Sequence, residues 1–227
     1  MREDSLQHQA EVGVAGRITP GAGRYRGKDA DERRAERRRR FRDAGLEMFG
    51  AGPGYRGTRL ADLCRTAGLS TRQFYEEYRT LEDLLADLHL YVNDVAERAV
   101  IEVLPRVQDR SLPERITAML HAYVQGATSD PRHARIAYVE IIGVSPRMDR
   151  QRLERRAAWI DFIGRTADQA VERGEMPPGN YRIAATGFIG AVNGLMHDWV
   201  VGWVDATMEE IADELLQILL GRYKITL

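Results

Sequence analysis

The chain has 227 residues, which is enough for one large domain or two small ones. Hydrophobic residues make up 44% and charged residues 30% of the sequence, a balance that is typical of globular proteins and argues against a membrane protein. The single cysteine, Cys64, excludes an internal disulfide and a zinc site built from several cysteines.

Positive charge is concentrated near the amino terminus, although the formal net charge of the whole chain is only -1. Residues 17 to 42 contain eleven basic side chains against four acidic ones. A local positive block in a nearly neutral protein indicates contact with a polyanion, but arginine-rich runs are also often solvated surfaces. The first thirty residues lack the continuous apolar core of a signal peptide, which favours a cytoplasmic protein.

The amino-terminal segment divides into an arm and a first helix. Residues 1 to 30 are polar and glycine-rich without a helical period, so the sequence predicts a disordered basic arm there. A first helix is expected from about Asp31 to Gly50, because Phe41, Met48 and Phe49 lie on one stripe. Glycines and a proline between residues 50 and 54 then end this helix.

The segment from Thr58 to Leu84 predicts two short helices joined by a tight turn. Thr58 is expected to cap the first helix, and Gly68 to end it in the left-handed conformation. Ser70 with Gln73 three residues later forms a capping box that starts the second helix. Two helices joined in this way form a helix-turn-helix, whose second helix fits the major groove of DNA.

The remainder of the chain continues with helical patterns. Pro146 should end the helix that begins at Asp130, and a long helix should follow from about Arg147 to Arg173. The expected caps or first residues of the later helices are Thr80, Ser111, Asp130, Arg147, Asn180 and Thr207. Since no alternating pattern is long enough for a strand, the predicted fold class is all-α with about nine helices.

The stretch from Ile183 to Trp203 is apolar for about twenty residues, long enough to suggest a membrane span. Asn193, His197 and Asp198 lie inside it and would each be costly in lipid, so no membrane contact is expected. Small residues in this helix would let another helix approach, and the last helix supplies a matching apolar stripe. The last two helices of two chains are therefore expected to form a homodimer interface, with a monomer core as the alternative.

With these pieces in place, the chain resembles the TetR family of one-component transcriptional regulators. The resemblance covers about a fifth of the sequence and rests on Phe41, Phe49, Gly54, Thr58, Leu63, Cys64, Ala67, Gly68, Leu69, Ser70, Phe74, Tyr75, Tyr78, Glu82, Asp83 and Leu84. It implies a homodimer that binds a double-stranded DNA operator through its amino-terminal heads and an unknown small-molecule effector through its carboxy-terminal domain.

Three segments follow from this interpretation. They are a basic arm over residues 1–30, a helix-turn-helix DNA-binding domain of three helices over residues 31–79, and a helical effector-binding and dimerisation domain over residues 80–227. The chain departs from the family pattern at Arg72, Glu77 and Leu81. Glu76 and Glu77 place negative charge near the expected phosphates, which would move operator contacts toward the arginine arm.

The candidate DNA contacts divide into base-reading and phosphate-binding residues. Arg72 suits guanine and Gln73 suits adenine, because these side chains match the edges of those bases in the major groove. Phe74 and Tyr78 are expected to face inward. The candidate phosphate contacts are Arg39, Arg40, Thr58, Arg59, Ser70, Thr71, Tyr75 and Arg79.

Candidates for an effector pocket are polar or aromatic residues on otherwise apolar faces of the later helices: His121, Tyr123, Tyr138, Trp159, Phe162, Asn193 and His197. Core packing with a satisfied hydrogen bond is the competing interpretation for each of them. Asn193 and His197 lie four residues apart, so they could face one cavity or pair across the dimer interface. A mostly apolar wall would suit a hydrophobic ligand.

Catalytic signatures are missing from the sequence. There is no Gly-x-Ser-x-Gly, no phosphate-binding glycine loop and no His-Glu-x-x-His, and the five histidines lack metal-ligand spacing. The sequence therefore favours a ligand-responsive repressor without cofactor or metal over an enzyme. The alternative is an activator or an architectural DNA-binding protein that responds to no small molecule.

Overall fold

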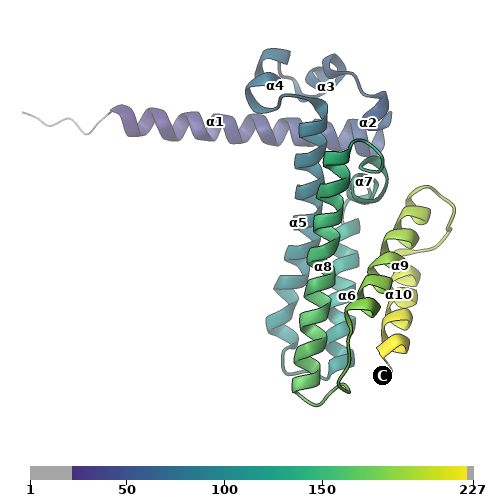
Figure 1. Ribbon diagram of the computed structural model, residues 1–227. Helices are drawn as coiled ribbons and strands as arrows, with labels where there is room; N and C mark the ends of the chain where they lie inside the picture. The colour runs from purple at the N-terminus through teal and green to yellow at the C-terminus, as the bar shows by residue number, and fades with distance from the viewer. Residues whose placement is uncertain (1–21, 224–227) are drawn as a thin grey trace, which may run out of the picture.

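The computed structural model describes residues 22–223, with side chains from residue 29 to residue 221. All regular structure within these residues is helical (Figure 1). The α-helices are α1 (Ala22–Gly45), α2 (Gly54–Gly57), α3 (Leu60–Ala67), α4 (Thr71–Glu77), α5 (Leu81–Val107), α6 (Leu112–Thr128), α7 (Pro131–Arg135), α8 (Pro146–Glu172), α9 (Arg182–Val200) and α10 (Met208–Tyr223). Two π-helical segments, η1 (Leu46–Ala51) and η2 (Ile136–Glu140), continue α1 and α7.

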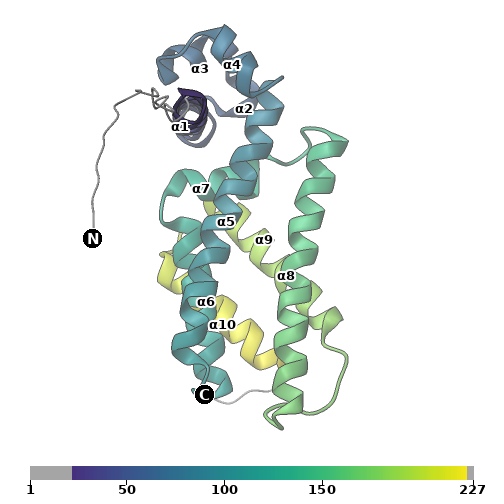
Figure 2. The same cartoon turned by 90° about the vertical axis from the view of Figure 1, so that its left-hand side faces the viewer.

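The molecule has a small head on a long helical body. Helices α1 to α4 form the head, and α1 extends away from the rest of the molecule at its amino-terminal end (Figure 1). Helices α5, α6 and α8 run down the body, and α9 and α10 cross behind them (Figure 2). No helix among residues 22–223 is long and apolar enough to cross a membrane.

Helix α1 begins earlier than the sequence predicts. Its first residue is Ala22, so residues 22–30 of the expected arm are helical, and residues 1–21 lie outside the described range. Arginine, lysine and alanine are good helix formers, and Asp29 pairs with Arg33 one turn later. These local terms outweigh the two glycines that suggested an irregular arm.

The head has its own buried core. The side chains of Phe41, Phe49, Leu63 and Phe74 are fully buried in it, and the rings of Phe41 and Phe74 meet edge to face at 5.3 Å. Cys64 lies in the same core, where burial raises the pKa of its thiol. This packing fixes α4 against α1 and α3.

Most of the expected helix ends are confirmed. Gly68 ends α3 with a φ of 61°, and Ser70 and Gln73 form the predicted capping box at the start of α4. Reciprocal caps also begin α5, α6 and α10, at Thr80, Ser111 and Thr207. Each of these caps needs partners only three residues apart, which is why the sequence pattern suffices.

Two expectations about helix boundaries are wrong. Thr58 does not cap α3: the N-cap is Arg59, and the Thr58 hydroxyl donates to the Gly54 carbonyl at 2.7 Å. The reason is α2, an additional short helix that brings this carbonyl beneath Thr58. With α2 there are ten α-helices among the described residues, in keeping with the expected number of about nine. The helix that begins at Pro131 continues as η2 and ends at Glu140, not near Ser145 as expected.

Candidate DNA-binding face and effector cavity

Helix α4 has one face in the core and one face in solvent. Phe74 and Tyr78 are 0% and 4% exposed, as predicted, whereas the Arg72 side chain is 91% exposed and Tyr75 is 61% exposed. Thr71 is exposed beside them. The outer face of α4 therefore presents a cation and a phenol to solvent on a helix that the core holds in place.

Gln73 occupies the expected position, but its side chain is engaged. Its Oε1 accepts hydrogen bonds from the Ser70 backbone N–H at 2.9 Å and from the Ser70 hydroxyl at 3.0 Å. Paired recognition of adenine requires both the oxygen and the nitrogen of a carboxamide. Gln73 would have to release the cap of its own helix to make that contact.

The remaining candidate phosphate contacts differ in their exposure to solvent and in the partners that already bind them. Arg59 and Arg79 are exposed beside α3 and α4, whereas Thr58 is buried with its hydroxyl satisfied and is corrected from a DNA contact to a structural residue. Arg39 is exposed but pairs with two carboxylates of α1, and Arg40 donates to the Gly68 carbonyl at 2.9 Å. Arg40 thus supports the turn between α3 and α4.

The expected negative charge of Glu77 does not reach the outer face. Its carboxylate is fully buried and accepts from Arg34 at 3.2 Å and from Arg37 at 2.8 Å. Glu76 remains at the surface, 3.6 Å from Arg72. The departure of Glu77 from the family pattern therefore ties α4 to α1 instead of repelling phosphate.

A second polar cluster ties the head to α5. Asp87 accepts from the Tyr78 hydroxyl at 2.6 Å and from Arg42 at 2.9 Å. Burial opposes ionisation of Asp87, but the hydrogen bonds from Arg42 and Tyr78 outweigh it and lower the pKa of Asp87. Burial and the adjacent carboxylate raise the pKa of Tyr78.

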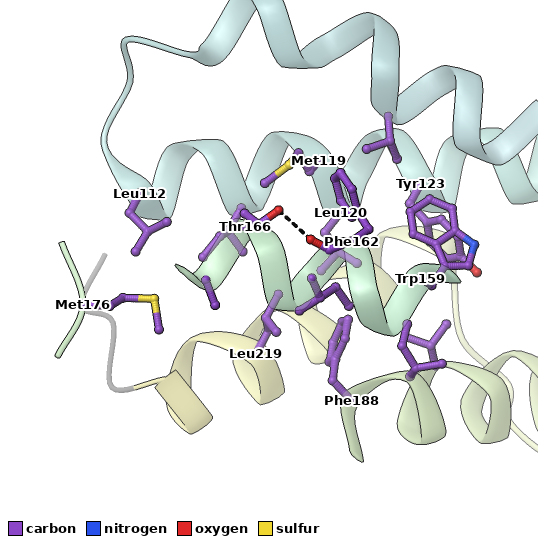
Figure 3. Close-up of a pocket in the computed structure, with 16 residues that line it drawn as sticks. Leu112, Met119, Leu120, Tyr123, Trp159, Phe162, Thr166, Met176, Phe188 and Leu219 are labelled. Atoms are coloured by element: carbon purple, nitrogen blue, oxygen red, sulfur yellow. Dashed lines mark hydrogen bonds between the residues drawn. The ribbon is translucent and has the colours of Figure 1, made fainter. Parts of the chain in front are cut away.

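The body contains a partly open apolar cavity of about 90 Å³ between α5, α6, α8, α9 and α10 (Figure 3). None of its lining side chains is charged. The Thr166 hydroxyl in the lining donates to the Phe162 carbonyl at 2.9 Å, so it is already satisfied. The cavity is lined by Val100, Leu112, Ile116, Met119, Leu120, Tyr123, Trp159, Phe162, Ile163, Thr166, Ala167, Met176, Phe188, Ile189, Val192 and Leu219.

Three of the seven pocket candidates line this cavity. Tyr123, Trp159 and Phe162 do so, and the Trp159 ring meets each of the other two edge to face (Figure 3). The buried Tyr138 lies next to the wall, with its hydroxyl 2.6 Å from that of Tyr123.

The other three candidates lie away from the cavity wall. His121 is exposed to solvent. Asn193 donates to the Ile189 carbonyl of its own helix at 2.6 Å, and His197 lies 2.9 Å from Asp198. Asn193 and His197 thus do not line this cavity, and pairing across a dimer interface remains the other alternative for them. Among the residues described there is also no group of three His, Cys, Asp or Glu side chains that could hold a metal ion.

Comparison with known proteins gives both a family and similar structures. A family model described as tetracyclin repressor-like, C-terminal domain, matches residues 109–222. The fatty acid degradation regulator FadR of Bacillus halodurans is similar with a TM-score of 0.70 at 16% identity, covering 82% of this chain and 95% of that chain. No curated protein matches the sequence.

Two further structures were solved with ligands. FadR of Bacillus subtilis in complex with stearoyl-CoA has a TM-score of 0.68 at 15% identity, covering 83% of this chain and 98% of that one. AibR in complex with isovaleryl coenzyme A and operator DNA has a TM-score of 0.61 at 24% identity, covering 81% and 97%. At sequence identities this low, the structural similarity establishes a shared fold and nothing more.

Proposed function

The chain belongs to the TetR family of DNA-binding transcriptional regulators, and from this premise we propose that it is a dimeric repressor whose operator binding ends when a hydrophobic molecule occupies its cavity. The observation that carries the proposal is the separation of two sites in one rigid chain. The free face of α4 lies in the head, and the uncharged cavity lies in the body.

For the DNA-binding head, we propose that Arg72 reads a base and that Tyr75 contacts a phosphate. The exposed cations Arg39, Arg59 and Arg79 would supply further phosphate contacts around α4. Ser70 and Thr71 lie at the amino end of that helix, where backbone N–H groups favour a phosphate. Helical residues 22–30 extend the basic surface of α1 beyond the proposed DNA-binding domain, residues 31–79.

For the effector, we propose an acyl thioester. Two proteins of the same fold were solved with such molecules, stearoyl-CoA in one and isovaleryl coenzyme A in the other. An acyl chain suits a cavity whose wall is aliphatic and aromatic throughout. Binding would then alter how the body holds the two heads, so that their recognition helices no longer match half-sites about one DNA turn apart.

For the dimer, we propose an interface formed by α9 and α10 within residues 80–227. Ile183 on α9 is 76% exposed and Ile218 on α10 is 38% exposed, which leaves an apolar face uncovered. On the same helices, Gly187, Gly194 and Gly221 have no atom within 4 Å of a Cβ placed on them. A second copy of the chain could approach closely at these glycines.

The test is a selection of bound DNA from a random pool, followed by release assays on the enriched sequence. We expect a palindrome with half-sites about one helical turn, ~34 Å, apart. Stearoyl-CoA or isovaleryl-CoA should release the protein from it, and free coenzyme A should not. A pool without enrichment would contradict operator recognition, and a palindrome that no acyl thioester releases would favour an activator or architectural protein instead.

A further inference from the structure

Two arginines of α8 are partly buried without a counter-ion. The Nε atoms of Arg152 and Arg156 are shielded from solvent and have no hydrogen-bond partner. Neither guanidinium forms an ion pair with any carboxylate among the described residues, and the nearest acceptor to Arg156 is the Thr186 carbonyl at 3.5 Å. A shielded N–H without an acceptor is costly, so the Nε–H groups of this pair are available to an anion.

The same two arginines stand on the face of α8 that lines the cavity. Trp159 and Ile163 belong to the cavity wall, and Arg156 and Arg152 precede Trp159 by three and seven residues. Residues at these spacings share one side of a helix. With a rise of 1.5 Å per residue, their backbones lie about 4.5 Å and 10.5 Å further toward the head than that of Trp159.

Neighbouring groups do not neutralise the pair. Two acids of α5 are paired with Arg155 instead, which donates to Asp94 at 2.8 Å and to Glu97 at 2.9 Å. His89 of α5 is also close to this part of α8, because Gln151 Nε2 lies 3.0 Å from its Nδ1. Burial first, and then the charges of Arg155 and Arg152, lower the pKa of His89 to about 4, so this residue is neutral near pH 7.

We propose that Arg152 and Arg156 bind the anionic group of an amphipathic effector whose acyl chain fills the apolar cavity. The inference rests on the proposed effector response and adds to it the charge and the direction of the ligand. The cavity wall has no charge to orient a ligand. Arg152 and Arg156, which lie on α8 between this wall and the head, would hold a carboxylate or phosphate by charge-assisted hydrogen bonds. The anionic end therefore faces the DNA-binding head.

The test compares three ligands with the same twelve-carbon chain: dodecanoyl-CoA, dodecanoate and the neutral alcohol dodecanol. Binding is measured without DNA by isothermal titration calorimetry. The variants Arg152→Gln and Arg156→Gln should each weaken binding of the anionic ligands roughly tenfold and leave dodecanol binding unchanged. Arg150→Gln, on the exposed side of the same helix, is the matched control and should change nothing.

The outcomes separate this inference from the proposed function. If the wild-type chain binds the anionic ligands and the Arg152 and Arg156 variants bind them equally well, the anion site is refuted and the effector class stands. Equal weakening for dodecanol would also refute it, because the arginines would then act through packing alone. If the wild-type chain binds none of the three ligands, both the effector class and the anion site fail. Weakening confined to dodecanoyl-CoA would assign the pair to coenzyme A phosphates, and weakening for both anionic ligands would show that the pair accepts either a phosphate or a carboxylate.

Discussion

Neighbouring residues of α4 have opposite environments, because Phe74 is buried and Arg72 is in solvent. Arg72 touches only Glu76, one turn away and 3.6 Å distant, so its removal should leave the fold intact. We expect Arg72→Ala to weaken binding to the selected operator by about 1–3 kcal/mol while binding to random DNA changes much less. Fluorescence anisotropy at fixed salt measures both affinities.

The matched control for Arg72 is Arg106→Ala, an exposed arginine near the far end of α5. Its loss removes the same charge without touching the head, so operator affinity should not change. Equal weakening of operator and random DNA by Arg72→Ala would assign Arg72 to a phosphate and contradict its base-reading role.

Asp87 links α5 to the head, and its contribution to the stability of the fold depends on pH. Its pKa is lowered in the folded chain, so its ionised form stabilises the fold above the ordinary pKa of about 3.8 and this stabilisation disappears as the pH falls through the lowered value. At pH 7, Asp87→Asn should reduce the free energy of unfolding by about 1–3 kcal/mol, because Arg42 and Tyr78 lose a charged acceptor.

Urea unfolding of the wild type and the Asp87 variant between pH 7 and pH 3 tests this dependence. The difference in free energy should be full at pH 7 and shrink below pH 4. Asp168→Asn, at an exposed site on α8, controls for the loss of one negative charge. If the difference in free energy of unfolding stays constant down to pH 3, the packing of the side chain and not its ionisation accounts for the effect.

At the scale of elements, the turn between α3 and α4 depends on Gly68. Its φ of 61° strains any residue with a Cβ, and that Cβ would lie 2.5 Å from the Arg40 guanidinium that holds the turn. We expect Gly68→Ala to cost about 1–2 kcal/mol from backbone strain and more from displacing Arg40. Gly174→Ala is the matched control, since its φ is 71° with no atom within 4 Å. Equal losses in urea unfolding would exclude any contribution from Arg40.

Elements with local causes could be predicted from the sequence, and elements with distant causes could not. The caps at Ser70 and Thr80 need only residues three positions away, so their spacing was sufficient. The burial of Glu77 depends on Arg34 and Arg37, about forty residues earlier in the chain. No local pattern identifies such partners.

The cavity shows the same limit. Tyr123, Trp159 and Phe162 stood out because aromatic residues are conspicuous on a helix. Met119 and Phe188 line the same space, yet apolar residues that border a cavity have the same sequence pattern as those that fill a core. The sequence also could not show that Arg155 forms ion pairs with α5 while Arg152 forms none, because such pairs depend on residues far away in the chain.

At the scale of the whole molecule, the head and the body share a core. Leu88 of α5, Ile136 of η2 and Met148 of α8 belong to the same buried cluster as Phe41. The backbone N–H of Tyr55 also donates to the Glu140 carboxylate at 2.7 Å. A shift of α5, η2 or α8 in the body would therefore move the head as a rigid unit, which is how occupancy of a cavity in the body could alter a distant DNA contact.

The proposed dimer would set the distance between two such heads, and Gly187 on α9 allows the dimer to be tested. Arginine fits there in one chain, since no atom lies within 4 Å of its Cβ, and it favours a helix over glycine by roughly 1 kcal/mol. Across a two-fold axis, Gly187→Arg would place two like charges in an apolar interface. We expect a monomer in analytical ultracentrifugation and an unfolding free energy no lower than that of a wild-type protomer. Operator affinity should fall by ~10²-fold or more, because each half-site then binds independently.

The matched control is Gly164→Arg, on α8 with equally open space, which should remain dimeric. A Gly187→Arg chain that still sediments as a dimer would place the interface elsewhere than α9 and α10.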